Sequence, residues 1–236
     1  MLQQFVIPLD APLPELAAYG LYALLLGRTP RAFAGALHET GFTPVSQYVC
    51  ADRWCLTALN GAAAQVLEQA LEGFDRVTLH RLGREVRLGT PRVQTIEDPA
   101  QFLEAALPAS VKLRFLTPTA FKSGGYYRLL PTEMLLLKSL VQRWNGCFGE
   151  ECPIEDSGGG LEAMAQGLIY RRVQLESRDF PMKNTQIPGT IGWIQAENRC
   201  RGFHRQLCAG LLEFGCFSGV GIKTALGMGG FTIDRQ

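Results

Sequence analysis

The stretch "QQFVIPLDAPLPELAAYGLYALLLGR", residues 3–28, joins two segments with different hydrophobic patterns. The first of them, "QQFVIPL", is typical of a β-strand. Apolar residues then recur at the three- and four-residue spacing of a helix, and Pro14 suits the first turn of that helix because the turn leaves its N–H groups unpaired. The stretch therefore predicts a strand followed by a helix, and the segments after it decide which fold this pair begins.

The following segments extend the pair into a β-α-β-β-α-β order. Two segments typical of paired strands come first, then a helix with Gly73 as its stop signal, then a segment in which apolar and polar residues alternate. The three strands and the helix are predicted at 42–51, 53–60, 76–82 and 61–74. This order is that of the ferredoxin-like split unit.

The same order recurs in the second half of the chain. Pro131 and Thr132 are predicted to open its first helix, and Gly146 to close it. The strands are predicted at 110–121, 168–180, 190–197 and 229–233, and the helices at 131–148 and 204–219. We therefore expect an α+β protein of two tandem ferredoxin-like, RRM-like domains, residues 1–105 and 106–236, with an acidic, glycine-rich loop at 149–160.

Composition and charge exclude several classes of protein. Of the 236 residues, 47% are hydrophobic and 19% are charged, which is ordinary for a globular protein. The net charge of +1 argues against a protein that coats nucleic acid without selection, so anion binding has to be local. We find no apolar run long enough for a membrane span and no signal peptide, and the seven cysteines include no C-x-x-C pair. These features predict a cytoplasmic protein with reduced thiols, no metal site and no membrane partner.

The glycine-rich stretch "FSGVGIKTALGMGGF", residues 217–231, does not match the common phosphate-binding motifs. A Walker A loop needs a glycine directly before Lys223, and the dinucleotide fingerprint needs one at the position of Thr224. The pattern that fits is a Gly-x-Gly pair, a spacer and a second Gly-x-Gly pair, at Gly219, Gly221, Gly227 and Gly229. We expect main-chain N–H groups of these glycines to face an anion, with Lys223 and Thr224 beside them. The alternative is a tight turn that only holds the last strand.

Three segments in the right order resemble the CRISPR-associated endoribonucleases that process precursor CRISPR RNA, a family of RAMP proteins. The glycine-rich loop is similar to the C-terminal signature of that family. "LRFLTPTAFKSGG" with "LPTEMLLLKSLVQRWN" resembles the start of its second domain, and "LHETGFTPVSQY" resembles its active-site segment, in which a histidine precedes the second strand. The family fold is two ferredoxin-like domains, in agreement with the element order above.

The resemblance implies metal-independent cleavage of one phosphodiester bond within each repeat. The 2′-hydroxyl of the substrate attacks the adjacent phosphorus, and the products carry a 2′,3′-cyclic phosphate and a 5′-hydroxyl. Such a reaction needs a base, an acid and positive charge near the phosphorane, and it needs no cofactor. The implied partner is CRISPR repeat RNA, as precursor and as mature guide, and for some family members also other subunits of an effector complex.

Histidine is the side chain best suited to these proton transfers, and the chain has three of them. His38 follows an apolar segment and stands at the end of an element, where catalytic groups are common. His80 is predicted on an exposed strand face. His204 is predicted at the start of a helix, where packing or capping is the better explanation. We therefore predict His38 as the catalytic histidine.

A helix tyrosine and an arginine are the candidate partners of His38. Tyr19 and Tyr22 lie one turn apart, on the side of their helix expected to face away from its leucines. The resemblance favours Tyr22 by its distance along the chain from the histidine, although ordinary half-buried aromatics would look the same. Many family members have a lysine shortly after the histidine, which this chain lacks. Arg28 or Arg31 can supply the charge instead, and Arg31 is the predicted residue.

Basic residues outside the active-site segment are candidates for RNA binding. Lys122 stands in "FKSGG", and Arg171 and Arg172 start a predicted strand. The resemblance favours these three together with Lys223, because family members often hold RNA on the second domain and the glycine loop. A run of arginines at 76–92 is equally consistent with a solvated hairpin.

Two other functions stay open from the sequence. A non-catalytic RAMP protein that binds guide RNA inside an effector complex shares the fold and the glycine loop but does not need His38. A nucleotide-binding regulatory protein would use the Lys-Thr pair of the loop, against the failed Walker spacing. Incubation with labelled repeat RNA distinguishes the three. The nuclease cuts the RNA, the non-catalytic subunit binds it without cutting, and the nucleotide-binding protein does neither.

Overall fold

A computed structural model of the protein describes residues 1–39, 42–104, 107–156, 158–182 and 185–235. The chain forms two compact units. The first contains Met1–Glu97 together with Lys223–Gly227, and the second contains Asp98–Ile222 together with the chain from Met228 on. This division differs from the expected domains 1–105 and 106–236 because the boundary falls earlier and the middle of the glycine-rich loop groups with the first unit.

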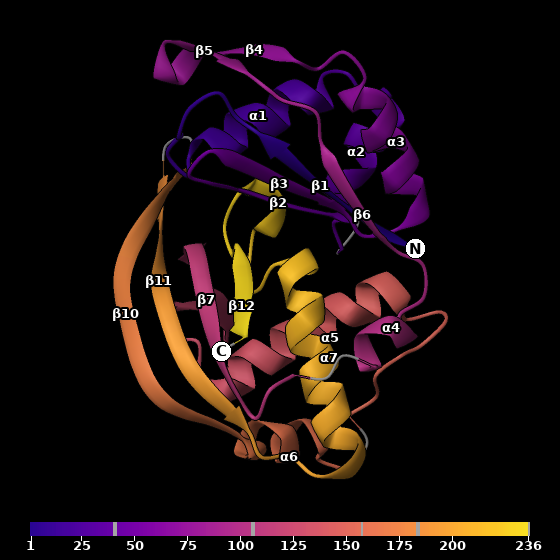
Figure 1. Ribbon diagram of the computed structural model, residues 1–236, viewed down its shortest axis with the longest axis vertical. Coiled ribbons are helices and arrows are strands. Elements are labelled where there is room, and N and C mark those ends of the chain that lie inside the picture. The colour runs from indigo at the N-terminus through magenta and orange to yellow at the C-terminus, as the bar shows by residue number, and fades with distance from the viewer. Residues whose placement is uncertain (40–41, 105–106, 157, 183–184, 236) are drawn as a thin grey trace. The chain divides into compact units, whose positions relative to one another are not determined.

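The first unit is built on a four-stranded antiparallel sheet with the strand order β2-β3-β1-β6. This is the ferredoxin-like order, and Figure 1 shows α1 and α3 on one face of the sheet. The elements of the sheet and its helices are β1 (Leu2–Pro8), α1 (Ala17–Leu26), α2 (Arg31–Glu39), β2 (Val45–Cys50), β3 (Arg53–Ala58), α3 (Gly61–Leu71) and β6 (Arg92–Ile96).

The hydrophobic core of this unit lies between the sheet and its helices. Val45 of β2 and both Leu21 and Leu25 of α1 are fully buried there. Strands contribute every second residue and helices every third or fourth, which is the pattern seen in the sequence. The helix α3 begins at Asn60, whose side-chain oxygen accepts a hydrogen bond of 2.8 Å from the N–H of Ala63 and so caps the helix.

The fourth strand of this sheet is not the one predicted. The segment predicted as a strand at 76–82 divides into β4 (Arg76–Leu79) and the 3-10 turn η1 (His80–Leu82), and β4 pairs with β5 (Arg84–Arg87) in a separate two-stranded sheet. β6 completes the main sheet by pairing with β1. Most of β6 is exposed, so its sequence has no buried face that would have marked it as a strand. The helix α2 was also absent from the prediction.

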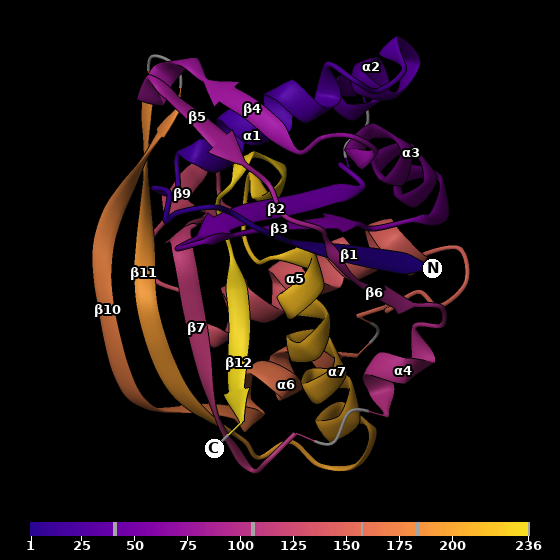
Figure 2. The same cartoon turned by 45° about the horizontal axis from the view of Figure 1, so that its top comes forward.

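The second unit repeats the topology with a sheet in the order β10-β11-β7-β12. Figure 2 shows α5 and α7 on one face of this sheet. The elements are α4 (Ala100–Leu103), β7 (Ser110–Thr119), α5 (Glu133–Phe148), α6 (Gly160–Gly167), β10 (Leu168–Met182), β11 (Thr185–Asn198), α7 (Gly202–Ser218) and β12 (Phe231–Arg235). The two tandem ferredoxin-like folds expected from the sequence are therefore present.

Helix α5 begins where the sequence predicted but ends later. Thr132 caps it, because its hydroxyl oxygen accepts a hydrogen bond of 3.3 Å from the N–H of Leu135. Gly146 was expected to end the helix, yet it lies inside α5. Phe148 in the last turn is buried against Trp144, with ring centroids 4.9 Å apart. This packing outweighs the cost of an internal glycine, which is about 1 kcal/mol.

Two hairpins extend the second unit beyond the predicted elements. β10 and β11 form a long, curved hairpin, drawn in orange in Figure 1. The short strands β8 (Phe121–Ser123) and β9 (Tyr126–Arg128) form a second hairpin between β7 and α5. The 3-10 turn η2 (Thr224–Leu226) lies in the part of the glycine-rich loop that belongs to the first unit.

Candidate functional site

The residues predicted for catalysis come from two consecutive helices of the first unit. Tyr22 lies on α1, Arg31 begins α2, and His38 lies in the last turn of α2, at the end of an element as expected. His38 follows Arg31 by seven residues, which is a rise of about 10 Å along the helix axis. Arg31 is exposed, whereas the side chain of His38 lies outside the described part of the structure.

Tyr22 does not face the way the sequence suggested. It was expected on the side of α1 away from the leucines, but it is only 4% exposed and packs with Leu21 and Leu25 in the core. Its hydroxyl has no hydrogen-bond partner among the described residues. Burial raises the pKa of this hydroxyl above its ordinary value. Tyr22 therefore stays protonated at neutral pH, where it can donate a hydrogen bond or a proton but cannot serve as a base.

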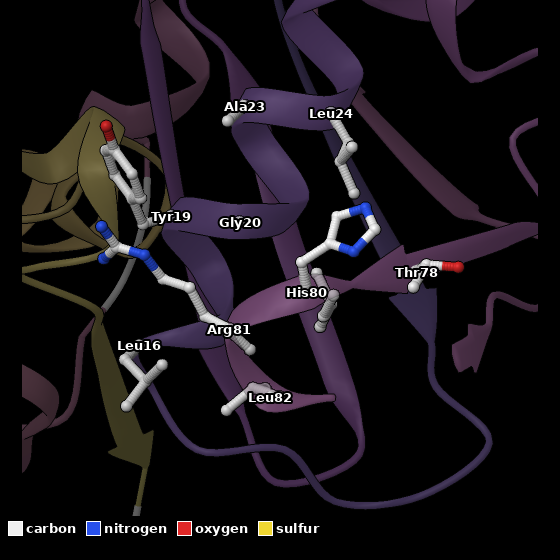
Figure 3. Close-up of a pocket in the computed structure, with 11 residues that line it drawn as sticks. Leu16, Tyr19, Gly20, Ala23, Leu24, Thr78, His80, Arg81 and Leu82 are labelled. Carbon is white, nitrogen blue, oxygen red and sulfur yellow. The ribbon is translucent and has the colours of Figure 1, made fainter. Parts of the chain in front are cut away.

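Tyr19 lines a hollow of about 230 Å³ between α1 and η1. Figure 3 shows the guanidinium of Arg81 beside the ring of Tyr19, 6.0 Å from the ring centre, and His80 pointing toward Leu24. His80 is exposed as predicted, although it lies on η1 rather than on a strand. The hollow brings His80 to Tyr19 and not to Tyr22, so it is a different place from the site predicted from the sequence.

Arg28, the arginine considered beside Arg31, has a structural role. Its guanidinium donates hydrogen bonds to the main-chain carbonyl groups of Glu72 and Gly73, just beyond α3, and lies 5.6 Å from the ring centre of Phe74. Cations commonly bind the unpaired carbonyl groups at the end of a helix in this way. This leaves Arg31 as the arginine candidate.

The four glycines of the loop pattern adopt backbone conformations that other residues avoid. The φ angles are +67°, +78°, +110° and +70° at Gly219, Gly221, Gly227 and Gly229. At Gly221 there is also no room for a side chain, because a Cβ atom would lie 2.2 Å from the carbonyl oxygen of Ala120. The fold itself therefore requires glycine in this loop.

The N–H groups of three of these glycines already have acceptors inside the protein. Gly219 donates to Gly215, Gly221 to the hydroxyl of Ser139 and Gly229 to Pro118, at 2.9, 2.7 and 3.1 Å. Gly227 is buried. The expectation that these N–H groups face an anion is therefore wrong for Gly219, Gly221 and Gly229.

The middle of the loop has one exposed and one buried polar residue. Lys223 is exposed and adopts a left-handed conformation with φ of +55°. Thr224 is only 2% exposed, so its side chain is not available at the surface, contrary to its predicted part in RNA binding. The carbonyl oxygen of Ala225 accepts a hydrogen bond of 3.0 Å from Gln47, and Gln47 accepts one of 2.9 Å from the indole of Trp54. These bonds hold the middle of the loop within the first unit.

The other predicted RNA-binding residues belong to the second unit and are exposed. Lys122 lies on β8, and Arg171 and Arg172 lie on β10. A β-bulge between β10 and β11 at this point interrupts the alternation that would otherwise send the two arginines to opposite faces. Glu197 accepts hydrogen bonds from Arg171 at 2.9 Å and from Arg199 at 2.8 Å, which lower the pKa of Glu197 to about 2.

Sequence reasoning missed a lysine of α5. A hollow of about 80 Å³ is lined by Lys122, Lys138, Gln142 and Gly221. It brings together Lys122 and Gly221, which were predicted separately, and adds the exposed Lys138. The signal that would have indicated it is a lysine among the leucines of the helix that directly follows "FKSGG".

The described residues include neither a metal-site cluster nor a membrane-spanning helix. No group of three or more His, Cys, Asp and Glu side chains in that part of the chain has the arrangement of a metal site. None of its helices is long and apolar enough to cross a membrane. His204 lies in the first turn of α7, in the second unit.

Two ferredoxin-like sheets in one chain define a class of double ferredoxin-like proteins, and solved structures of that class share the fold. A Cas6 product complex matches with a TM-score of 0.76 and 24% identity, over 99% of this chain and 100% of that one. Thermus thermophilus Cas6 matches with a TM-score of 0.68 and 24% identity, over 99% and 98%. An RAMP protein described as binding different RNA substrates has a TM-score of 0.59 at 14% identity, over 99% of both chains.

The sequence comparisons identify the family within this class. The family model for the CRISPR-associated endoribonuclease Cas6 matches residues 113–231, which include the glycine-rich loop. A Cas6 of Mycobacterium tuberculosis is 28% identical over 244 residues, 97% of this chain and 76% of its own length. A Cas6 of Streptococcus thermophilus is 30% identical over 122 residues, 52% of this chain and 49% of its own length. The chain belongs to the family of CRISPR-associated endoribonucleases Cas6.

Proposed function

We propose that this protein cuts precursor CRISPR RNA within its repeats, without a metal ion, and binds both the precursor and the mature guide RNA. The observation that carries the proposal is membership of the endoribonuclease family. The sequence adds a histidine that suits the chemistry, because His38 ends α2 just before β2, in the segment that resembles the active-site segment of the family.

The proposed reaction is a transesterification within the RNA. The 2′-oxygen loses its proton to a base and forms a bond to the adjacent phosphorus, while the bond from phosphorus to the 5′-oxygen breaks and that oxygen takes up a proton. The RNA supplies the nucleophile, so no covalent intermediate with the protein is needed. His38 is the proposed proton-transfer group, since imidazole titrates near neutral pH.

Arg31 and Tyr22 are the proposed partners of His38. A guanidinium is a cation that cannot act as a proton shuttle, so the proposed role of Arg31 is to stabilise the negative phosphorane. Tyr22 is kept protonated by burial, because burial raises the pKa of its hydroxyl. Since this hydroxyl is buried, its proposed role is hydrogen-bond donation to another group of the site and not to the RNA. A buried hydroxyl without a partner costs free energy, so its presence needs an explanation, and a catalytic role is one such explanation.

The proposed RNA contacts are made by side chains. Lys223, Lys122 and Arg172 are exposed cations that can pair with phosphates, and Arg171 can do so while it shares Glu197 with a neighbour. The glycines at 219, 221, 227 and 229 contribute by letting the loop take its shape, since three of their N–H groups are used internally.

The test is incubation of the purified protein with labelled repeat RNA in the presence of EDTA. We expect cleavage at one position in the repeat under single-turnover conditions. Tight binding without cleavage would favour a non-catalytic subunit of an effector complex, and neither binding nor cleavage would remove RNA processing as the function.

A further inference from the structure

The β8–β9 hairpin exposes aromatic rings to solvent. Tyr126 is 71% exposed and Tyr127 is 47% exposed, both on β9, and Leu130 shortly after the strand is 65% exposed. The two tyrosines are consecutive on β9, so their rings lie on opposite faces of the hairpin. Large exposed apolar side chains on both faces of so small a hairpin indicate an interaction site. The described residues around these rings leave them exposed, so they are accessible to a ligand.

The hairpin is a rigid support for these rings. Gly124 and Gly125 form its two-residue turn with φ of +58° and +83°, and Ser123 pairs with Tyr126 directly across it. Two positive φ angles in a two-residue turn are the geometry that matches the twist of a hairpin. At the other end Phe121 is 2% exposed, which fixes the hairpin to the second unit. Presentation of Tyr126 and Tyr127 from an ordered turn lowers the entropy cost of binding a ligand on them.

Cations accompany the rings. Lys122 pairs across the hairpin with Tyr127 and lines the hollow of about 80 Å³ to which α5 contributes Lys138. Arg128, at the end of β9, is exposed as well. No acidic side chain lines this hollow among the described residues. An apolar protein partner would gain nothing from these lysines, whereas nucleic acid offers bases to the rings and phosphates to the cations.

Resting on the function proposed above, we propose that the β8–β9 hairpin is a stacking platform for unpaired nucleotides of the bound RNA. Tyr127, on the face of the hairpin that carries Lys122, and Tyr126, on the opposite face, each stack on a base, and Lys122 and Lys138 pair with the phosphates next to the base on Tyr127. The ligand is single-stranded because bases inside an A-form helix have both faces covered by their neighbours. The hairpin thus binds unpaired nucleotides selectively, and the paired part of a repeat is bound elsewhere on the protein.

The test compares two RNA probes and four proteins. The probes are a labelled oligoadenylate of about 12 nucleotides, within the length that one stacking domain covers, and a blunt RNA duplex of similar length. The proteins are the wild type, the double variants Tyr126→Ala with Tyr127→Ala and Tyr126→Phe with Tyr127→Phe, and the control Phe203→Ala, which removes a 62% exposed ring from α7. Because the rings are exposed, thermal unfolding should be the same in all four.

We expect the alanine pair to lower affinity for the oligoadenylate by about 10- to 100-fold, as for the loss of one or two stacked bases. Affinity for the duplex should change by less than about 2-fold, and the phenylalanine pair and Phe203→Ala should bind both probes like the wild type. Replacement of Lys122 and Lys138 by alanine should make the slope of log affinity against log salt concentration less steep, by about 0.7 for each lysine, when the oligoadenylate is bound. In the wild type, ultraviolet cross-linking of a bromouridine-substituted oligonucleotide should modify Tyr126 or Tyr127.

Unchanged affinity of the alanine pair for the oligoadenylate would overturn the proposal and assign the surface to a protein contact. An equal loss on the duplex, or cross-links only outside β8 and β9, would overturn it too. Cleavage of repeat RNA by the wild type is scored separately. If the wild type binds the oligoadenylate through its tyrosines but does not cut repeat RNA, the endonuclease function is refuted. If the alanine pair binds the oligoadenylate with full affinity and still cuts repeat RNA, only the stacking platform is refuted.

Discussion

The two units have the same strand order but differ in the segments inserted into it. In the first unit α2 is inserted before the second strand of the sheet, and β4 with β5 before the last. In the second unit β8 with β9 is inserted after the first strand. The candidate catalytic residues lie on α1 and α2, and the exposed rings lie on β9. The candidate site residues are therefore divided between α1, which belongs to the repeated fold, and inserted segments, which differ between the units.

The largest expected difference between the units is their part in catalysis. We expect His38→Ala in the first unit to slow single-turnover cleavage by about 10²- to 10⁴-fold, the usual contribution of a general acid or base. His204→Ala in the second unit is the matched control and should cleave at the wild-type rate. RNA affinity should stay within about 2-fold for both, since one imidazole is a small part of the contact. Equal rates for the two variants would remove His38 from the mechanism.

The glycine-rich loop should respond to substitution through stability. In Gly221→Ala the new Cβ would lie 2.2 Å from the carbonyl oxygen of Ala120, which also accepts a hydrogen bond from Ile222. We expect a loss of about 3 kcal/mol in the free energy of unfolding, from backbone strain and the displaced loop. Gly73→Ala has a similar φ of +63° with nothing near the added methyl group, so it should cost about 1 kcal/mol. Thermal unfolding with RNA binding measures both effects.

A Gly221→Ala protein that melts like the wild type but loses RNA affinity would contradict the structural account of this loop. It would restore the direct approach of the main chain to an RNA phosphate that the sequence first suggested.

The two tyrosines of α1 allow a finer comparison within the first unit. Tyr22→Phe removes a buried hydroxyl that has no described partner, so we expect the free energy of unfolding to hold or rise by about 1 kcal/mol. Cleavage should nevertheless slow by about 10-fold, the value of a hydrogen bond to a charged group. Tyr19→Phe should leave both quantities unchanged. If the two variants cleave equally well, Tyr22 is only a core residue.

The smallest effect is expected at the start of β10. Glu197→Gln keeps the shape of the side chain and removes the charge shared by Arg171 and Arg199. We expect repeat RNA to bind about 2- to 5-fold more tightly, because exposed ion pairs are weak and the freed arginine can pair with phosphate. Glu176→Gln, which removes the carboxylate that accepts a hydrogen bond from Arg178 farther along the strand, is the control and should bind as the wild type does. Tighter binding by both variants would indicate a general charge effect and no specific role for Arg171.

The sequence predicted three of the four strands of the first sheet and all four of the second, most clearly where strands such as β1 and β7 bury alternate residues. It failed at one exposed strand and on a uniformly apolar helix. β6 was missed because it is a mostly exposed edge strand. The facing of Tyr22 was wrong because α1, "AAYGLYALLL", is apolar on every side, so no face is marked as the inner one. The sequence identified the glycines of the loop, but glycine is required both for tight internal packing and for a main chain that binds an anion. Only the positions of Ala120 and Ser139 distinguish the two explanations.

The measurement that tests the central claim most directly is cleavage of a repeat RNA with a single 2′-deoxynucleotide at the scissile position. The proposed mechanism uses that 2′-oxygen as the nucleophile, so the modified RNA should bind with unchanged affinity and resist cleavage in EDTA. The unmodified RNA should give a 5′ product that ends in a 2′,3′-cyclic phosphate. Cleavage of the deoxy-substituted RNA at the same bond would contradict the account, because the attacking oxygen would then have to come from water or from the protein.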